Sequence, residues 1–171
     1  MTCEASGNAV VIRTLSPDDL PTCVNVIRSS FRTVADELGF TPENAPRFTA
    51  FSVTEEKLRG QFEDERRLML GAFADSRELI GCCSLLFQDP NECELNCLCV
   101  LPAYRHNGIG EALLDGACAR ARETGCVRMN LSIVEENRPL RRWYERHGFT
   151  HTGTRKFDFF PFTCGYMTRA L

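Results

Sequence analysis

The sequence has 171 residues, enough for one domain of ordinary size and too few for two. Its composition, 43% hydrophobic and 25% charged, is typical of a globular protein and excludes a disordered chain. Lys and Arg number 20 against 23 Asp and Glu, and the resulting net charge of −3 argues against nonspecific binding to nucleic acid or to an anionic membrane. Residues 1–8 hold no basic cluster followed by an apolar block, so a cytoplasmic location is expected.

Ten cysteines raise the question of disulfides or a metal site. They are scattered through apolar segments without paired C-x-x-C spacings, so neither reading is favoured. A buried reduced cysteine behaves as a small hydrophobic residue, and we expect no metal. The alternation of Cys93, Cys97 and Cys99 predicts that these three side chains share one face of a strand.

The first part of the chain predicts one strand and three helices. Ser16 is a candidate N-cap, because Pro17 and two acidic residues follow it in the first turn. Residues 40–51 contain prolines and phenylalanines and are expected to form an ordered loop. The predicted elements are a strand Val10–Leu15, a helix from Ser16 through Phe31, a short helix from about Arg32 to Leu38, and a helix Thr54–Phe62.

The second part of the chain predicts six strands and two helices. The elements are strands Arg67–Ala74 and Glu78–Gln88 joined by a turn at Asp75, Ser76 and Arg77, strand Glu92–Leu101, helix Gly110–Thr124, strand Val127–Val134, helix Pro139–His147, and strands Phe149–Phe159 and Phe162–Ala170. Apolar periodicity places one face of each helix against the sheet. We therefore predict an α/β fold with one mixed sheet in a single domain spanning residues 1–171.

A strand running through a tight loop into a helix carries the first functional motif. Arg105, Gly108 and Gly110 lie at the start of that helix, where backbone N–H groups are unpaired and the helix dipole is positive. Glycines allow a phosphate to approach the backbone closely, so the loop is a candidate pyrophosphate site. The third glycine of a dinucleotide-binding fingerprint is replaced by Leu113, and the alternative is a helix start that uses glycine only for its turn.

The second motif places Asn137 seven residues before Tyr144 and ends in Gly148 and Phe149. With it, the sequence resembles the GNAT superfamily of acyl-CoA-dependent N-acyltransferases, as a small bacterial-type member. The family pattern V-x-P-x-[YF]-[RQ]-x-x-G-[IVL]-G is filled from Val100 to Gly110. The resemblance covers roughly residues 92–170.

The resemblance implies a mostly antiparallel sheet of about seven strands, flanked by helices and splayed between the fourth and fifth strands. It implies acetyl-CoA as cosubstrate, a cofactor-binding core at about 92–150, and acceptor-side elements at about 16–66 and 150–171. The cofactor-binding residues that it implies are Leu98, Cys99 and Val100 for the pantetheine arm, Arg105, His106, Asn107, Gly108, Ile109 and Gly110 for the pyrophosphate, and Asn137 for the pantetheine. Asn137 is equally interpretable as an N-cap ahead of Pro139.

Tyr144 is the candidate general acid, because the family places a tyrosine here near the cofactor sulfur and a phenol with a pKa near 10 is protonated at neutral pH. The alternative is a core aromatic residue. Glu94 is the candidate base, acting directly or through water, with Glu92 as the competing choice. The three histidines, His106, His147 and His151, are weaker candidates.

The acceptor is expected between residues 31–51 and 156–166. Five phenylalanines, Phe40, Phe48, Phe51, Phe160 and Phe162, form either an apolar acceptor wall or core, and Glu43 and Asp158 are candidate ligands for an ammonium group. The leading hypothesis is acetylation of a small-molecule primary amine. A protein N-terminus or lysine is the alternative acceptor, a non-catalytic acyl-CoA sensor is the alternative class, and the family allows a homodimer.

Overall fold

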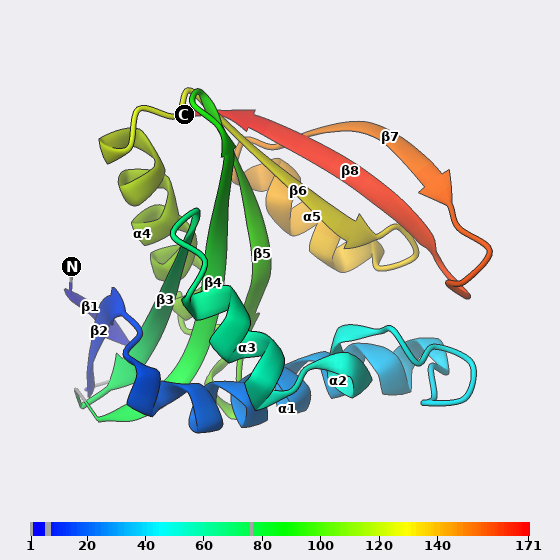
Figure 1. Ribbon diagram of the computed structural model, residues 1–171, viewed down its shortest axis with the longest axis horizontal. Helices are drawn as coiled ribbons and strands as arrows, with labels where there is room; N and C mark the ends of the chain where they lie inside the picture. Colours follow the sequence, from blue (N-terminus) through cyan, green and yellow to red (C-terminus); the bar gives the residue numbers. More distant parts are fainter. Residues whose placement is uncertain (1, 6–7, 76) are drawn as a thin grey trace.

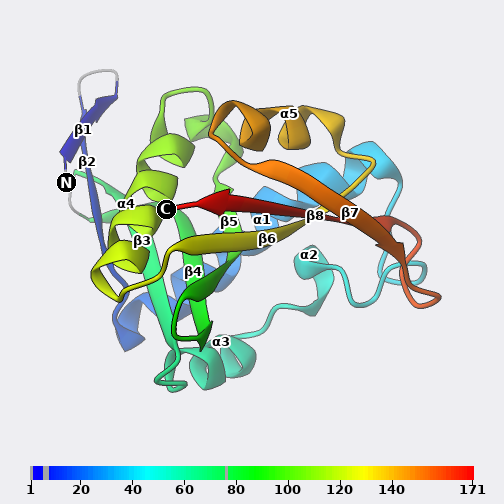
Figure 2. The ribbon, with the colours of Figure 1, turned by 90° about the horizontal axis from the view of Figure 1, so that it is seen from above.

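The computed structural model describes residues 2–5, 8–75 and 77–171 (Figure 1). Met1, Ser6 and Gly7, in the N-terminal stretch 1–8, and Ser76, in the predicted turn, lie outside the described residues. One eight-stranded sheet runs in the order β1-β2-β3-β4-β5-β6-β8-β7. The strands are β1 (Thr2–Ala5), β2 (Asn8–Thr14), β3 (Arg67–Ala74), β4 (Glu78–Asp89), β5 (Glu92–Val100), β6 (Arg128–Val134), β7 (Thr150–Lys156) and β8 (Thr163–Ala170). Figure 2 shows β7 and β8 at the opposite end of the sheet from β1 and β2.

Helices cover both faces of the sheet. They are α1 (Leu20–Leu38), α2 (Thr49–Ser52), α3 (Glu55–Phe62), α4 (Ile109–Glu123) and α5 (Arg138–Arg146), with short 3-10 helices at Pro17–Asp19 and Pro102–Tyr104. We call the face packed against α1 and α3 the front face, and the face packed against α4 and α5 the back face. Among the described residues, no helix is both long and apolar enough to cross a membrane.

The helix after the first long strand differs from the prediction. We expected a break near Arg32, but α1 runs without interruption for 19 residues. The segment holds no glycine or proline between Phe31 and Leu38, and Arg32 pairs with Asp36 one turn later at 3.3 Å. Gly39 then ends the helix in the left-handed conformation (φ 69°), as its position after the apolar face predicts.

Most other boundaries agree with the sequence to within a few residues. The Thr54 side chain caps α3 by accepting a hydrogen bond from the Lys57 N–H at 3.2 Å. One strand was not predicted from the sequence. This strand, β1, pairs antiparallel with β2 at the sheet edge and is the eighth strand of the sheet. The predicted ordered loop after α1 is confirmed and contains the single turn α2.

A β-bulge in β5 overturns the prediction for three cysteines. The register with β4 shifts between Asn96 and Cys99, and Cys97 adopts a left-handed φ of 53°. Cys93 therefore packs on the back face and Cys99 on the front face. The expected shared face does not form, because the extra residue reverses the alternation.

The sheet is splayed where β5 meets β6. These strands are parallel and pair over only three positions, from Glu92 with Arg128 to Glu94 with Asn130, before they diverge (Figure 1). Residues 95–100 of β5 therefore have no strand partner along this edge within the described chain. The fourth and fifth strands predicted from the sequence correspond to β5 and β6, because β1 was not predicted. The splay predicted between them is therefore confirmed.

Candidate active site

The loop between β5 and α4 presents a run of unpaired backbone donors. His106 and Gly108 both have left-handed φ angles, 64° and 75°, which turn the chain sharply before α4 begins at Ile109. No described residue accepts a hydrogen bond from any of the consecutive N–H groups of residues 106–111. Such a run at a helix N-terminus is suited to binding an anion.

Arg105 makes contacts that the sequence did not indicate. Its three side-chain nitrogens donate to the Val100 carbonyl at 3.1 Å, the Thr33 hydroxyl at 3.0 Å and the Ser30 carbonyl at 2.8 Å. Its own N–H donates to the Pro102 carbonyl at 3.3 Å. In this structure Arg105 therefore joins the end of β5 to α1, and contact with the pyrophosphate stays a prediction.

The remaining predicted cofactor residues lie around this loop and the open edge of β5. The side chains of Cys99, Val100 and Ile109 are buried, so they can offer only backbone groups to a ligand. Asn107 is exposed and donates to the Arg105 carbonyl at 3.2 Å. Leu98 follows the bulge, and Gly110 would place a Cβ 3.7 Å from Trp143. The loop is therefore bounded by the only tryptophan of the chain.

Asn137 is an N-cap in the structure. Its side-chain oxygen accepts a hydrogen bond from the Leu140 N–H at 3.2 Å, at the start of α5. This confirms one of the two interpretations of Asn137. Its predicted contact with the pantetheine stays open, because a capping side chain still has its amide NH₂ available.

Tyr144 combines a buried ring with an unpaired hydroxyl. The ring packs in α5 between Trp143 and Phe149, with centroid distances of 5.0 and 5.3 Å, and the residue is only 5% exposed. The hydroxyl has no hydrogen-bond partner among the described residues. It nevertheless keeps some contact with solvent, because among the described residues the only side-chain oxygen or nitrogen that is both fully buried and without a partner is Ser30 Oγ. Burial raises the pKa of Tyr144 well above its usual range, so the phenol is a proton donor throughout the neutral range.

The two candidate glutamates differ in their partners. Glu92 accepts hydrogen bonds from Arg128 at 2.6 Å and from the Asn130 amide at 2.8 Å. The Glu94 carboxylate has no hydrogen bond or ion pair with any residue that the structure describes, and it lies on the front face beside the splay. A paired carboxylate is a poor proton acceptor, so this geometry favours Glu94 over Glu92.

The three histidines stay weaker candidates for proton transfer. His106 is exposed in the loop. The other two contact protein groups: His147 Nδ1 lies 2.8 Å from the Trp143 carbonyl, and His151 Nε2 lies 2.9 Å from Glu135. These contacts explain both as structural residues at α5 and β7.

The expected acceptor elements meet, but most of their phenylalanines are core. Phe40, Phe48 and Phe162 are buried and contact one another with centroid distances of 5.2 to 5.9 Å. Phe51 and Phe160 are partly exposed beside them. Glu43 and Asp158 are exposed, and a hydrogen bond from Thr41 lowers the pKa of Glu43.

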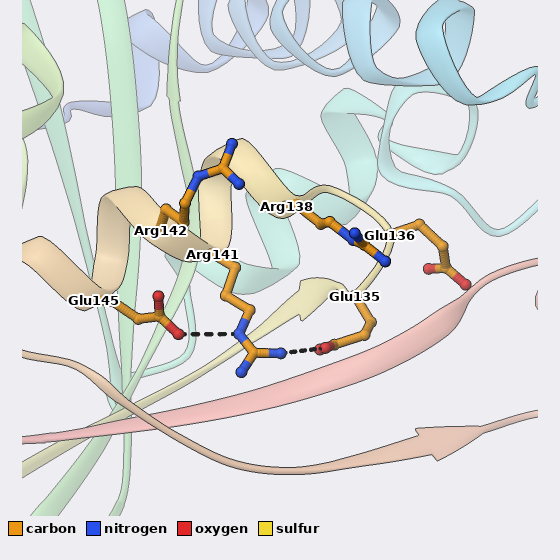
Figure 3. Close-up of a pocket in the computed structure, with 6 residues that line it drawn as sticks. All are labelled: Glu135, Glu136, Arg138, Arg141, Arg142 and Glu145. Carbon is orange, nitrogen blue, oxygen red and sulfur yellow. Dashed lines mark hydrogen bonds and ion pairs between the residues drawn. The ribbon is translucent and has the colours of Figure 1, made fainter.

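A pocket of about 460 Å³ opens at the start of α5 (Figure 3). It is lined by Glu135, Glu136, Arg138, Arg141, Arg142 and Glu145. Arg141 bridges Glu135 at 2.6 Å and Glu145 at 3.0 Å, and in Figure 3 Arg142 points away from this ladder. The pocket depends on the fold, because the β6–α5 loop contributes Glu135 and Glu136 to a lining that α5 completes.

Register also aligns residues that the sequence did not single out. Glu94 pairs with Leu86 and Asn130, Leu86 pairs with Arg67, and Asn130 pairs with Thr168. These five residues form one row across the front face, which we call the front row. The proposed base therefore lies in the middle of a row that crosses the splay.

Residues 32–149 match the model of the Acetyltransferase (GNAT) family, which covers more than half of the chain. The chain belongs to the GNAT acetyltransferase family. It is similar to the spermidine N(1)-acetyltransferase of Thermoplasma acidophilum, with 30% identity over 155 residues that cover 88% of this chain and 94% of that protein. It is also similar to an uncharacterized N-acetyltransferase of Mycobacterium tuberculosis, with 31% identity over 116 residues that cover 68% of this chain and 74% of the relative.

Solved structures agree with this assignment. The PaiA N-acetyltransferase of Thermoplasma acidophilum, in complex with coenzyme A, superposes with a TM-score of 0.82 and 28% identity over 95% of this chain and 99% of that one. The ribosomal-protein-S18-alanine N-acetyltransferase of Escherichia coli shares the fold, with a TM-score of 0.74 and 18% identity over 94% and 93% of the two chains. This GNAT protein is thus an acyltransferase, and the coenzyme A complex of its neighbour supports acetyl-CoA as the cosubstrate.

Proposed function

We propose that this GNAT acetyltransferase moves the acetyl group of acetyl-CoA to a small-molecule primary amine by direct attack in a ternary complex. One observation carries the proposal. The unpaired N–H groups of residues 106–111 and the unpaired carboxylate of Glu94 lie at either end of the exposed edge of β5. The first can hold the donor's pyrophosphate, and the second can take the acceptor's proton.

The donor would bind along the open strand edge. The pyrophosphate accepts hydrogen bonds from the loop at Gly108, and the pantetheine arm runs beside Leu98, Cys99 and Val100 in place of a strand partner. The bulge at Cys97 lies on this exposed edge, where the thioester would arrive. Asn137, at the start of α5, lies on the other side of that splay and contributes its amide.

The reaction needs one base and one acid. Glu94, directly or through a water molecule, takes the proton of the attacking amine, whose nitrogen forms the new bond to the thioester carbonyl carbon. A backbone N–H near Val100 stabilises the negative charge that develops on the carbonyl oxygen. The carbon–sulfur bond then breaks, and Tyr144 gives its proton to the departing thiolate. The products are an N-acetylated amine and coenzyme A.

The acceptor class follows from two considerations. The spermidine acetyltransferase, similar over nearly the whole chain, supports a small amine as acceptor. The ribosomal-protein acetyltransferase shares only the fold, so a protein N-terminus or a lysine side chain is the second candidate. A non-catalytic acyl-CoA sensor is less consistent with an unpaired Glu94 and an unpaired Tyr144 hydroxyl beside one splay.

The test compares two neighbouring carboxylates. We expect Glu94→Gln to lower kcat/KM for an accepted amine by about 100-fold, the lower end of the general-base range, with unchanged acetyl-CoA affinity. Glu92→Gln, which removes a charge that already pairs with Arg128, is the matched control and should have a several-fold effect at most. Equal losses in the two variants would contradict the assignment of Glu94. Loss of transfer in Cys99→Ala with intact acetyl-CoA affinity would replace direct attack by an acyl-enzyme route.

A further inference from the structure

Arg67, at one end of the front row, is a largely buried cation without a hydrogen bond. Its side chain is 19% exposed. No described residue accepts a hydrogen bond from its guanidinium, and its nearest anionic contact is Asp64, with 3.8 Å between Nε and the carboxylate. That carboxylate is already bound by Arg66, which donates to both of its oxygens at 2.9 Å. A guanidinium in this position has several free donors and no committed partner.

Arg67 shares the front row with the proposed base. Arg67 lies on the front face of β3, opposite Leu86 of β4, which in turn lies opposite Glu94. Arg67 therefore lies on the same face of the sheet as Glu94, two strands away from the proposed base.

Glu92 and Arg128, the charged residues beside the front row on β5 and β6, are paired with each other. Thr168 donates to the Asn130 side chain at 2.8 Å, Asn130 donates to Glu92 at 2.8 Å, and Arg128 completes the chain through its 2.6 Å contact with Glu92. Within the row, Glu94 has no partner among the described residues, and Arg67 has only its 3.8 Å ion pair with Asp64 and no hydrogen bond from its guanidinium. The backbones of Arg67 and Glu94 are two strand spacings apart, about 9.5 Å, with the buried Leu86 between them.

From this arrangement we infer that Arg67 is a specificity-determining residue that binds a carboxylate of the acceptor, so that the substrate is an amino-carboxylic acid. The inference rests on the proposed function and narrows its acceptor class. An amino-carboxylic acid offers both groups that the row lacks, a carboxylate for the planar guanidinium and an amine for Glu94. A simple polyamine would leave the guanidinium without a hydrogen-bonded partner and would place a second positive charge near it.

The experiment uses pairs of amines that differ by one carboxylate: ornithine with putrescine, and tyrosine with tyramine. Acetylation of each is followed by product mass with the wild-type chain, Arg67→Gln, Arg67→Lys and Arg66→Gln. Arg66 is the matched control, since it is the adjacent arginine and its side chain is 67% exposed. The fluorescence of Trp143, the only tryptophan, beside Gly110, reports acetyl-CoA affinity independently.

We expect Arg67→Gln to raise KM for the carboxylated member of an accepted pair by about ten-fold or more, as for loss of a charge-assisted hydrogen bond. The value for its decarboxylated partner, and the acetyl-CoA affinity, should not change. Arg67→Lys should retain part of the discrimination, and Arg66→Gln all of it. If Arg67→Gln does not fold, Arg67→Lys carries the same comparison.

Two results would overturn the inference while leaving the proposed function intact. One is that the ratio of KM values between the two members of a pair, such as ornithine and putrescine, is the same in the wild-type chain and in the Arg67 variants. The other is an equal loss for both members of a pair, which a purely structural role of Arg67 would produce. If acetyl-CoA binds and no amine is acetylated, the proposed function itself fails and the inference fails with it.

Discussion

Arg105 donates a hydrogen bond to the carbonyl oxygen of Ser30 at 2.8 Å and so connects the loop after β5 to the middle of α1. The same guanidinium holds the Thr33 hydroxyl and the Val100 carbonyl. These contacts fix the end of β5, where the donor is proposed to bind, relative to the helix that covers the front face. Preorganisation of the loop is therefore a property of the folded chain before any ligand binds.

Arg105→Lys should destabilise the protein. Lysine keeps the positive charge but cannot reach three oxygens in a planar fork, so part-buried acceptors lose their donors at a cost of about 1–3 kcal/mol. Thermal unfolding should show a decrease of about 2–4 °C for each kcal/mol in a chain of this size. Arg142→Lys, at an exposed arginine with no partner among the described residues, is the control. An unchanged melting temperature with weakened acetyl-CoA binding would instead make Arg105 a ligand contact only.

Gly108→Val should weaken acetyl-CoA binding by more than about ten-fold, since a branched side chain would cover the unpaired N–H groups. Its left-handed φ of 75° adds a folding penalty of about 1–2 kcal/mol. Gly125→Val is the matched control, because Gly125 has φ 94° at the other end of α4 and open space around it. We expect both variants to lose similar stability, and only Gly108→Val to lose acetyl-CoA affinity, measured through Trp143 fluorescence. Equal affinities would contradict the placement of the pyrophosphate.

Tyr144→Phe should lower kcat by about 10²-fold and leave acetyl-CoA affinity unchanged, because only the proton donor is removed. Burial raises the pKa of Tyr144, so the phenol remains protonated beyond the usual range of a tyrosine. The kcat of the wild-type chain should therefore show no decrease from phenol ionisation up to about pH 10. A wild-type rate in the variant would make Tyr144 a core aromatic residue alone.

Asp19 should make stability depend on acidic pH. Hydrogen bonding to Arg13, together with bonds from Ser16, lowers the pKa of Asp19 to about 2. A carboxyl with a lowered pKa stabilises the folded state above its unfolded pKa, near 4, and loses this contribution as the pH falls toward 2. Urea unfolding should show Asp19→Asn to be less stable by about 1–2 kcal/mol at pH 6, after discounting for the exposed Arg13, and nearly equal to wild type at pH 2. A constant difference between these pH values would contradict this linkage.

Local sequence patterns were sufficient for the elements that hold the predicted donor residues. Helix α4 after Gly108 and helix α5 around Tyr144 are both continuous local segments, so spacing along the chain predicts them, while the roles of their residues stay predictions. The same locality explains why α3 and its Thr54 cap were predicted. The break expected in α1 was wrong because propensity over a short window does not include the packing that continues past Arg32.

The acceptor side depends on pairing between strands. The preference for Glu94 over Glu92 comes from Arg128 and Asn130, which lie more than 30 residues away on β6. The proposal for Arg67 also depends on pairing, because alternation along β3 shows which face Arg67 occupies but not which residues lie opposite it. No glycine or other local sequence feature marks the bulge at Cys97. The bulge places Cys99 on the opposite face of β5 from the one predicted.

The most direct test of acetyl transfer to a small amine is product mass after mixing acetyl-CoA with a panel of amines. The panel should span polyamines, amino acids, aminoglycosides, arylamines and short peptides, with Tyr144→Phe in parallel. Mass detection avoids thiol reagents, which the ten cysteines of the chain would also consume. We predict a small amine that gains one acetyl group with the wild-type chain and far less with the variant. Acetylation of peptides alone, or binding of acetyl-CoA with no acetylated product, would contradict the proposed function.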